Sequence, residues 1–243
     1  DLHTAYRRQR QMCIRDRYMD NYNYQKGMKA IIQELKYFLK RKDIGTDSDR
    51  ALLLDFQATL EIKPEKAIKL EKDALAQIEN ITADNARLVS NLHANLGGLY
   101  RMNGHPDLAR EHMEKSISLL DQFNLLHIND SIPQIANYAM FLTEQQEPER
   151  GISELQKLSG IIKEYHSDDC LDYAKVQETL GTIYLMTANL PQAKTHFKRA
   201  FKIYEKIWAD EPEMIEAKYQ EIQELYPQIG FYIGKNLSGL LTK

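Results

Sequence analysis

Apolar side chains recur every three or four positions along most of the chain, which is the spacing of amphipathic helices. The clearest segment, residues 85–123, predicts two such helices. The first is expected to end near Gly104, because glycine readily adopts the left-handed conformation that terminates a helix. Pro106 is expected to open the second, since the missing N–H of proline costs little in a first turn. The two apolar stripes are Leu88, Leu92, Leu96, Leu99 and Tyr100, then Ala109, Met113, Ser116 and Leu120.

This helix pair repeats along the chain at an interval of 42 residues. One helix hairpin repeated by stacking accounts for the interval. It predicts an all-α fold, a right-handed α-solenoid of antiparallel helix hairpins. The positions that share the register are Leu96, Tyr138 and Leu180; Gly97, Ala139 and Gly181; Tyr100, Leu142, Tyr184 and Tyr226; Ala109, Gly151 and Ala193; and Pro64, Pro106 and Pro148.

Small residues mark the places where the two helices of a hairpin are expected to cross closely. Only Gly, Ala or Ser leaves room for two backbones there, and a bulky side chain typically costs about 1–3 kcal/mol. The expected pairs are Gly97 with Ala109, Ala139 with Gly151, and Gly181 with Ala193. The structural positions of the repeat are predicted to be Gly97, Tyr100, Ala109, Ala139, Gly151, Gly181, Tyr184, Ala193 and Ala200.

Polar clusters lie between the helix pairs and are expected to cap the helices that follow, each cap contributing about 1 kcal/mol. They are residues 47–49, 82–85, 129–131, 167–169 and 210–211.

The first seventeen residues do not fit the pattern and are expected to be foreign to the protein. They hold five arginines and two aspartates with no apolar period, and residues 12–16 resemble the translated end of a sequencing-library adapter. The alternative is a basic arm for nucleic acid or a membrane. Residues 18–243 are predicted to form one helical array of about five helix pairs, truncated at its N-terminus.

The outer units of the array are weaker copies of the repeat, as is usual for terminal units. Residues 51–60 predict a first helix that carries Asp55 where glycine or alanine is expected. Residues 27–40 predict the second helix of a still earlier unit. At the other end, residues 214–226 predict a first helix and residues 231–241 a short closing helix.

Charge and composition narrow the possible partners. Without the first seventeen residues the net charge falls from −3 to −6, which argues against a nucleic-acid-binding surface. The one remaining cysteine, Cys170, cannot form an internal disulfide, which favours a reducing compartment and a cytoplasmic location. No apolar run approaches the roughly 20 residues that a membrane helix needs.

The repeat resembles the tetratricopeptide repeat, in its 42-residue kinesin-light-chain-like variety, which is also widespread in bacterial regulators. The family pattern is matched by Leu180, Gly181, Tyr184, Ala193, Phe197 and Ala200, with Ala188 in place of a glycine. The resemblance implies a non-catalytic scaffold that binds a protein or an extended peptide in a concave groove. The alternative is a peptide-sensing regulatory domain of a larger signalling or transcription-regulating protein whose N-terminal module is missing.

The resemblance also implies that the first helix of each pair lines the groove. In that variety, asparagines at the position of Asn95 and Asn137 hold the bound peptide, and Thr179 departs from the pattern. An asparagine amide can both donate to and accept from a peptide backbone, and methionines supply adaptable apolar contact. The alternative is an ordinary solvated surface. The groove stripe is Asn91, Asn95, Gly98 and Met102; Pro133, Asn137, Met140 and Glu144; and Lys175, Thr179, Thr182 and Met186.

No pattern of catalytic or metal-binding residues is found in the sequence. The histidines of residues 18–243 lack the H-E-x-x-H spacing, Cys170 has no second thiol, and phosphate-binding and nucleophile-elbow motifs are absent. His166, Asp168, Asp169 and Cys170 are close in sequence, but a polar helix-capping turn explains them. We therefore predict no metal, no cofactor and no enzymatic activity.

Overall fold

The computed structural model describes residues 27, 29–33, 36–37, 40 and 45–225. The chain divides into two compact units, Asp1–His112 and Met113–Lys243. Residues 1–17 and 231–241, for which an adapter-derived segment and a closing helix were predicted, lie outside the described residues. The described residues of 27–40 are helical apart from a turn at residue 40.

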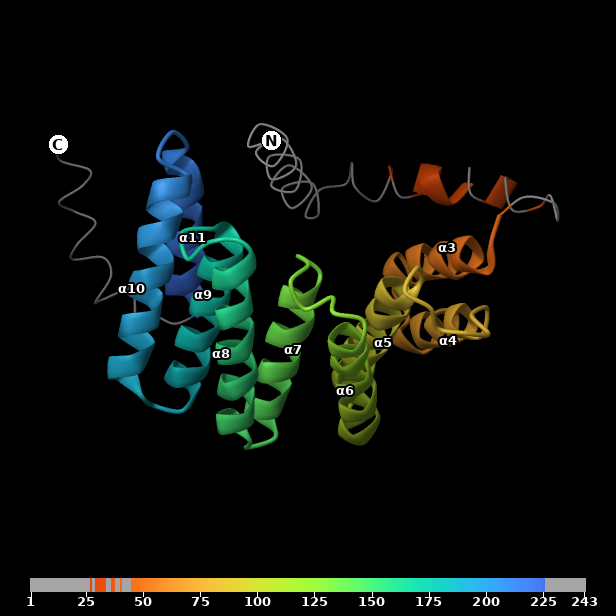
Figure 1. The fold of residues 1–243 in the computed structure, drawn as a ribbon, viewed down its shortest axis with the longest axis horizontal. Coiled ribbons are helices and arrows are strands. Elements are labelled where there is room, and N and C mark those ends of the chain that lie inside the picture. The colour runs from red at the N-terminus through yellow and green to blue at the C-terminus, as the bar shows by residue number, and fades with distance from the viewer. Residues whose placement is uncertain (1–26, 28, 34–35, 38–39, 41–44, 226–243) are drawn as a thin grey trace. The chain divides into compact units, whose positions relative to one another are not determined.

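The first unit is built from helix hairpins, as the apolar period predicts (Figure 1). Helix α3 packs against α4, and α5 packs against both of them. Ala51, Ala74 and Leu92, one from each helix, are fully buried at the centre of this packing. The helices are α3 (Asp47–Thr59), α4 (Pro64–Leu75), α5 (Ala86–Met102) and the first part of α6 (Pro106–Gln122).

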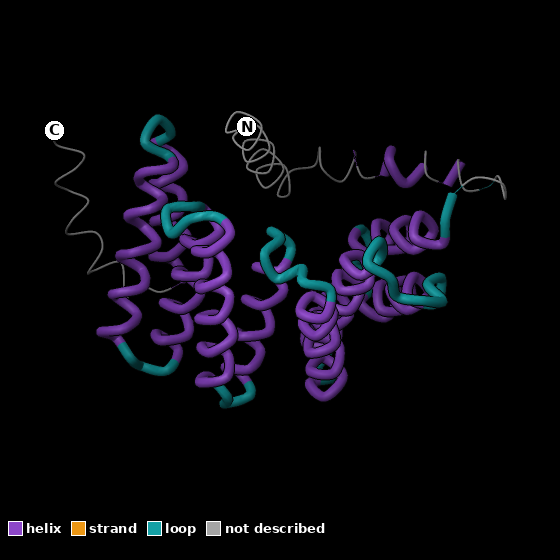
Figure 2. Tube along the Cα trace, viewed as in Figure 1, coloured by secondary structure: helices purple, strands orange, loops and turns teal. Residues whose placement is uncertain are grey.

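The second unit repeats the arrangement. Helix α7 packs against α8, α8 against α9, and α9 against α10, while α7 also touches α9 directly. The first helices of successive hairpins therefore lie side by side, and helices and loops make up all of the described chain (Figure 2). The helices are the rest of α6, α7 (Ser131–Glu144), α8 (Pro148–Tyr165), α9 (Leu171–Met186), α10 (Leu190–Ile207) and α11 (Pro212–Leu225). This confirms the predicted all-α solenoid of helix hairpins. None of the described helices is long and apolar enough to cross a bilayer.

The first helices α5, α7 and α9 end in the same way, at positions 42 residues apart. The second residue after each helix is left-handed, with φ of 74° at Gly104, 66° at Gln146 and 59° at Ala188. At each one, two backbone hydrogen bonds fold back onto the last turn, such as Asn189 N–H to the Tyr184 carbonyl at 2.7 Å. The predicted glycine terminator is confirmed at Gly104, and the same turn forms at the other two positions without a glycine.

Two of the hairpins bring a glycine of one helix into close contact with the other helix. A Cβ built on Gly151 would lie 2.7 Å from the Ala139 carbonyl oxygen, which confirms that pair. A Cβ on Gly181 would meet the ring of Phe197 first, at 2.8 Å. Phe197 lies one helical turn beyond Ala193 on α10, and its large ring fills the space beside the glycine.

The predicted capping residues are wrong for several helices. Thr46, outside the predicted cluster, caps α3 by a reciprocal pair of hydrogen bonds with Asp49. The thiol of Cys170 caps α9, while Asn85 and Asp130 make no side-chain capping bond. The amide oxygen of Asn85 accepts from the backbone N–H of Thr82 instead, so this side chain closes the turn before the helix.

Candidate functional site

The stripe predicted to line a groove is defined here as the first-helix face. In the first unit it runs along α5. Asn95 is exposed, Met102 is 82% exposed, and open space surrounds Gly98, whereas Asn91 is half-buried. These side chains form a continuous strip because they are spaced three and four residues apart on one helix.

In the second unit the first-helix face spans α7 and α9, which touch each other. Asn137 is exposed and Met140 is half-buried on α7. On α9, Lys175 and Thr179 are half-buried, and Thr182 is only 8% exposed. Thr182 therefore offers little area to a ligand. Asn137 is the better-placed polar contact of this face.

The side chain of Asn95 is already hydrogen-bonded within the first unit. Its amide Nδ2 donates to Asp55 Oδ1 on α3 at 2.8 Å, and its side chain also hydrogen-bonds Glu71 on α4. Asp55 and Glu71 are hydrogen-bonded to each other as well. Three helices thus bring two carboxyl groups and one amide together, and we name Asp55, Glu71 and Asn95 the carboxyl cluster. The predicted groove stripe included only Asn95 from it.

Burial dominates the electrostatics of the carboxyl cluster. Glu71 is 2% exposed, and its burial, together with the charge of Asp55, raises its pKa to about 9. Burial likewise raises the pKa of Asp55, against hydrogen bonds from Glu71 and Asn95 that lower it. Near pH 7 the pair therefore holds one proton between two carboxyl groups, because two adjacent buried carboxylates repel each other.

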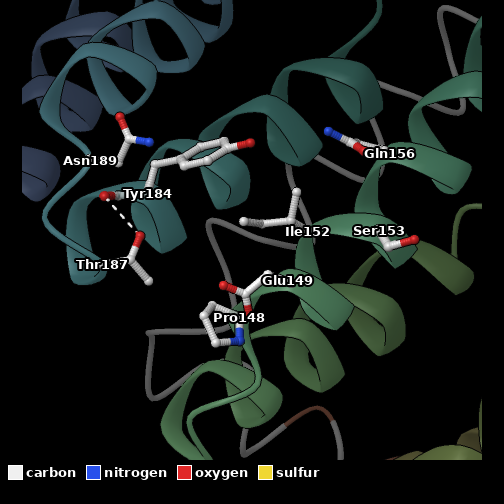
Figure 3. A pocket seen from close by; sticks show the side chains of 8 residues that line it. All are labelled: Pro148, Glu149, Ile152, Ser153, Gln156, Tyr184, Thr187 and Asn189. Atoms are coloured by element: carbon white, nitrogen blue, oxygen red, sulfur yellow. Dashed lines mark hydrogen bonds between the residues drawn. The ribbon is translucent and has the colours of Figure 1, made fainter.

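A hollow lies in the second unit, between α8 and the C-terminal end of α9. Its volume is about 450 Å³, and the side chains of Ile152 and Tyr184 extend toward it from the two helices (Figure 3). None of the predicted groove residues lines this cavity. Its lining is Pro148, Glu149, Ile152, Ser153, Gln156, Tyr184, Thr187 and Asn189.

Two histidines repeat a structural role at positions 84 residues apart. His112 Nδ1 lies 2.9 Å from His93 Nδ1 and its ring stacks on Tyr100. His196 Nδ1 lies 2.9 Å from Gln177 Oε1 and its ring stacks on Tyr184. Burial lowers the pKa of both His112 and His196. These contacts join the two helices of a hairpin, which is a packing role.

The segment 166–170 has the properties of a turn. The Cys170 thiol accepts the Tyr173 backbone N–H at 3.4 Å, and burial raises its pKa, whereas a reactive cysteine needs a lowered one. His166 Nε2 lies 2.9 Å from the His127 carbonyl oxygen. Within the described residues no group of three or more His, Cys, Asp or Glu side chains is placed to hold a metal ion.

Residues 131–206 match the model of the tetratricopeptide repeat family. Among solved structures, BtubC (BKLC) from P. vanneervenii is similar, with a TM-score of 0.65 at 18% identity over 85% of this chain and 83% of that one. Kinesin-light-chain TPR-like repeats from Podosopora anserina give a TM-score of 0.62 at 14% identity, over 84% and 97%. MamA gives 0.50 at 16% identity, over 74% and 90%. A search of curated proteins found no match.

Proposed function

We propose that this chain, whose residues 131–206 are tetratricopeptide repeats, is a non-catalytic scaffold that binds an extended peptide or a partner's helix on its first-helix face. The repeat family and the fold support an interaction scaffold in general. Recognition would use side-chain amides against a peptide backbone and methionines against its apolar side chains.

The observation that carries the proposal is the placement of Asn137. It stands exposed on α7, at the repeat position equivalent to Asn95 on α5, and beside a neighbouring first helix. Neither helix packing nor a helix cap accounts for an amide there. An extended peptide lying across α7 and α9 would find in it both a hydrogen-bond donor and an acceptor.

The proposal is tested with the full chain on an array of random peptides, followed by affinity measurements on the peptides that bind. Asn137→Ala should weaken binding by about 2- to 10-fold, because one such hydrogen bond contributes about 0.5–1.5 kcal/mol. Gln156→Ala is the matched control, since it removes an exposed amide from α8, a second helix. Unchanged affinity in Asn137→Ala, or an equal loss in Gln156→Ala, would contradict the proposed face. If the chain bound no peptide on the array, the proposal of peptide binding itself would be contradicted.

A further inference from the structure

The carboxyl cluster occupies positions that hold ordinary core residues in the other hairpins. At the register position of Asp55 the later units have glycine or alanine, and at that of Glu71 they have large apolar side chains. In the last complete hairpin the equivalent pair is Gly181 against the ring of Phe197, in direct contact. The equivalent pairs are Gly97 and Met113, Ala139 and Leu155, and Gly181 and Phe197.

Core packing does not explain two acids at these positions. A buried carboxyl costs free energy unless it is paired, and a second one beside it adds repulsion. Glu71 is 2% exposed, and its Oε2 is buried without a hydrogen-bond partner. Among the described residues no lysine or arginine acts on the pKa of either Asp55 or Glu71. The cluster therefore has acceptor capacity that nothing in the described chain satisfies.

The cluster reaches the surface of the first unit on the first-helix face. Asp55 is half-buried, Asn95 is exposed, and the hydrogen bond between them lies at the exposed side. Glu71 is buried and is hydrogen-bonded to the half-buried Asp55. A ligand bound along α5 would pass over Asp55 and Asn95, and the group that best matches these acceptors carries positive charge.

We propose that Asp55, Glu71 and Asn95 form a receptor for one cationic side chain, a lysine ammonium or an arginine guanidinium, of a peptide bound along α5 on the first-helix face of the first unit. The inference rests on the proposed function and names the chemistry of its ligand. The cation forms charge-assisted hydrogen bonds with Asp55, and the proton held between the two carboxyl groups leaves to solvent as the cation binds. A Ca²⁺ ion fits less well, because it takes six to eight oxygen ligands and the cluster offers few.

The test uses the full chain and the peptides that bind on the random array. Bound peptides should be enriched in lysine and arginine. For a bound lysine peptide, exchange of that lysine for norleucine should lower affinity at least about 5-fold at pH 7. Asp55→Asn should remove that preference, because Asp55 accepts from the cation, whereas Glu71→Gln should keep it and remove only the release of a proton. Asp73→Asn, an exposed acid on α4, is the matched control and should keep the preference.

Calorimetry in two buffers of different ionisation enthalpy supplies a second measurement. Binding of the lysine peptide should release up to about one proton at pH 7, and this release should vanish in Glu71→Gln. Peptides that bind equally well with norleucine would overturn this inference and leave the proposed function standing. No peptide binding at all would overturn both. If the wild type bound calcium and Glu71→Gln did not, the ligand of the carboxyl cluster would be a metal ion, and the proposal of a cationic side chain would be overturned.

Discussion

Gly151 lies where α8 crosses α7 so closely that a methyl group has no space. A Cβ at this position would sit 2.7 Å from the Ala139 carbonyl oxygen, a backbone atom that cannot swing aside. Gly151→Ala should therefore lower the free energy of unfolding by about 1–3 kcal/mol in urea denaturation. Gly160→Ala on the same helix is the control. Because nothing lies within 4 Å of a Cβ there, it should stabilise by about 0.5–1 kcal/mol. If Gly151→Ala and Gly160→Ala changed the free energy of unfolding equally, the close crossing of α7 and α8 would be contradicted.

Gln146 and Ala188 adopt a left-handed conformation that glycine adopts without strain. L-residues lose roughly 1–2 kcal/mol in this region, while glycine costs about 0.5–1 kcal/mol of additional chain entropy. Gln146→Gly and Ala188→Gly should therefore each raise the free energy of unfolding, by about 0.5 kcal/mol. The reverse change, Gly104→Ala, should lower it, since φ is 74° there. Destabilisation by both glycine substitutions in urea titrations would refute the strain at these helix ends.

Helix α11 is held to its neighbours in part by a half-buried charge network. Lys218 Nζ lies 2.9 Å from Glu178 Oε1 on α9, and the Tyr204 hydroxyl on α10 donates to the same carboxylate at 2.5 Å. Burial would lower the pKa of Lys218, but Glu178 and Glu221 raise it above its ordinary value. The ring of Tyr219 stacks on Phe201, with centroids 4.2 Å apart. One cation thus links three helices.

Lys218→Met should loosen α11 while the rest of the second unit stays folded. Its removal leaves Glu178 partly buried without a cation, which should cost about 1–3 kcal/mol. Amide exchange should accelerate in residues 212–225 and remain slow in α7 and α8. Lys206→Met is the control, because its ion pair with Asp169 is largely exposed and should be worth less than about 1 kcal/mol. Uniform acceleration across the unit would argue against a local role for Lys218.

The sequence predicts those features of the fold that depend on the order of residues within one helix pair. The apolar spacing predicted the helices, the 42-residue interval predicted the stacked hairpins, and Gly104 marked a helix end. Each of these signals lies within one helix pair or recurs unchanged in the next. These signals can therefore be recognised without knowing which side chains of different helices are in contact.

The features that the sequence did not predict depend on contacts between helices. The carboxyl cluster joins residues 16 and 40 positions apart, and only packing of three helices brings Asp55, Glu71 and Asn95 together. Asp55 was marked in the sequence as a departure from the repeat, which was the available signal. The cavity beside Tyr184 lies between a second helix and a first-helix end, a place that no periodic pattern identifies.

The two units should differ in their response to alkaline pH. Because the fold raises the pKa of Glu71 from 4.5 to about 9, the folded first unit retains a proton that the unfolded chain releases. This contribution is complete below pH 4.5 and is lost as the pH rises toward 9. The lowered pKa of His112 and His196 acts in the opposite direction, and only below about pH 6.5. Between pH 7 and pH 9, therefore, the titration of Glu71 makes the first unit lose more stability than the second, where the raised pKa of the Cys170 thiol acts only near pH 9.

Hydrogen exchange at pH 7 and pH 9, corrected for intrinsic rates, measures this difference helix by helix. The opening free energy of α3, α4 and α5 should fall by on the order of 2 kcal/mol, since each pH unit within the window removes about 1.4 kcal/mol. Helices α7 to α10 should change less, because the described part of the second unit contains no buried pair of acids, and the raised pKa of the Cys170 thiol lowers its stability only as the pH approaches 9. Glu71→Gln should abolish the fall, while Asp73→Asn should preserve it. A fall of equal size in both units, or its persistence in Glu71→Gln, would place the titrating group elsewhere.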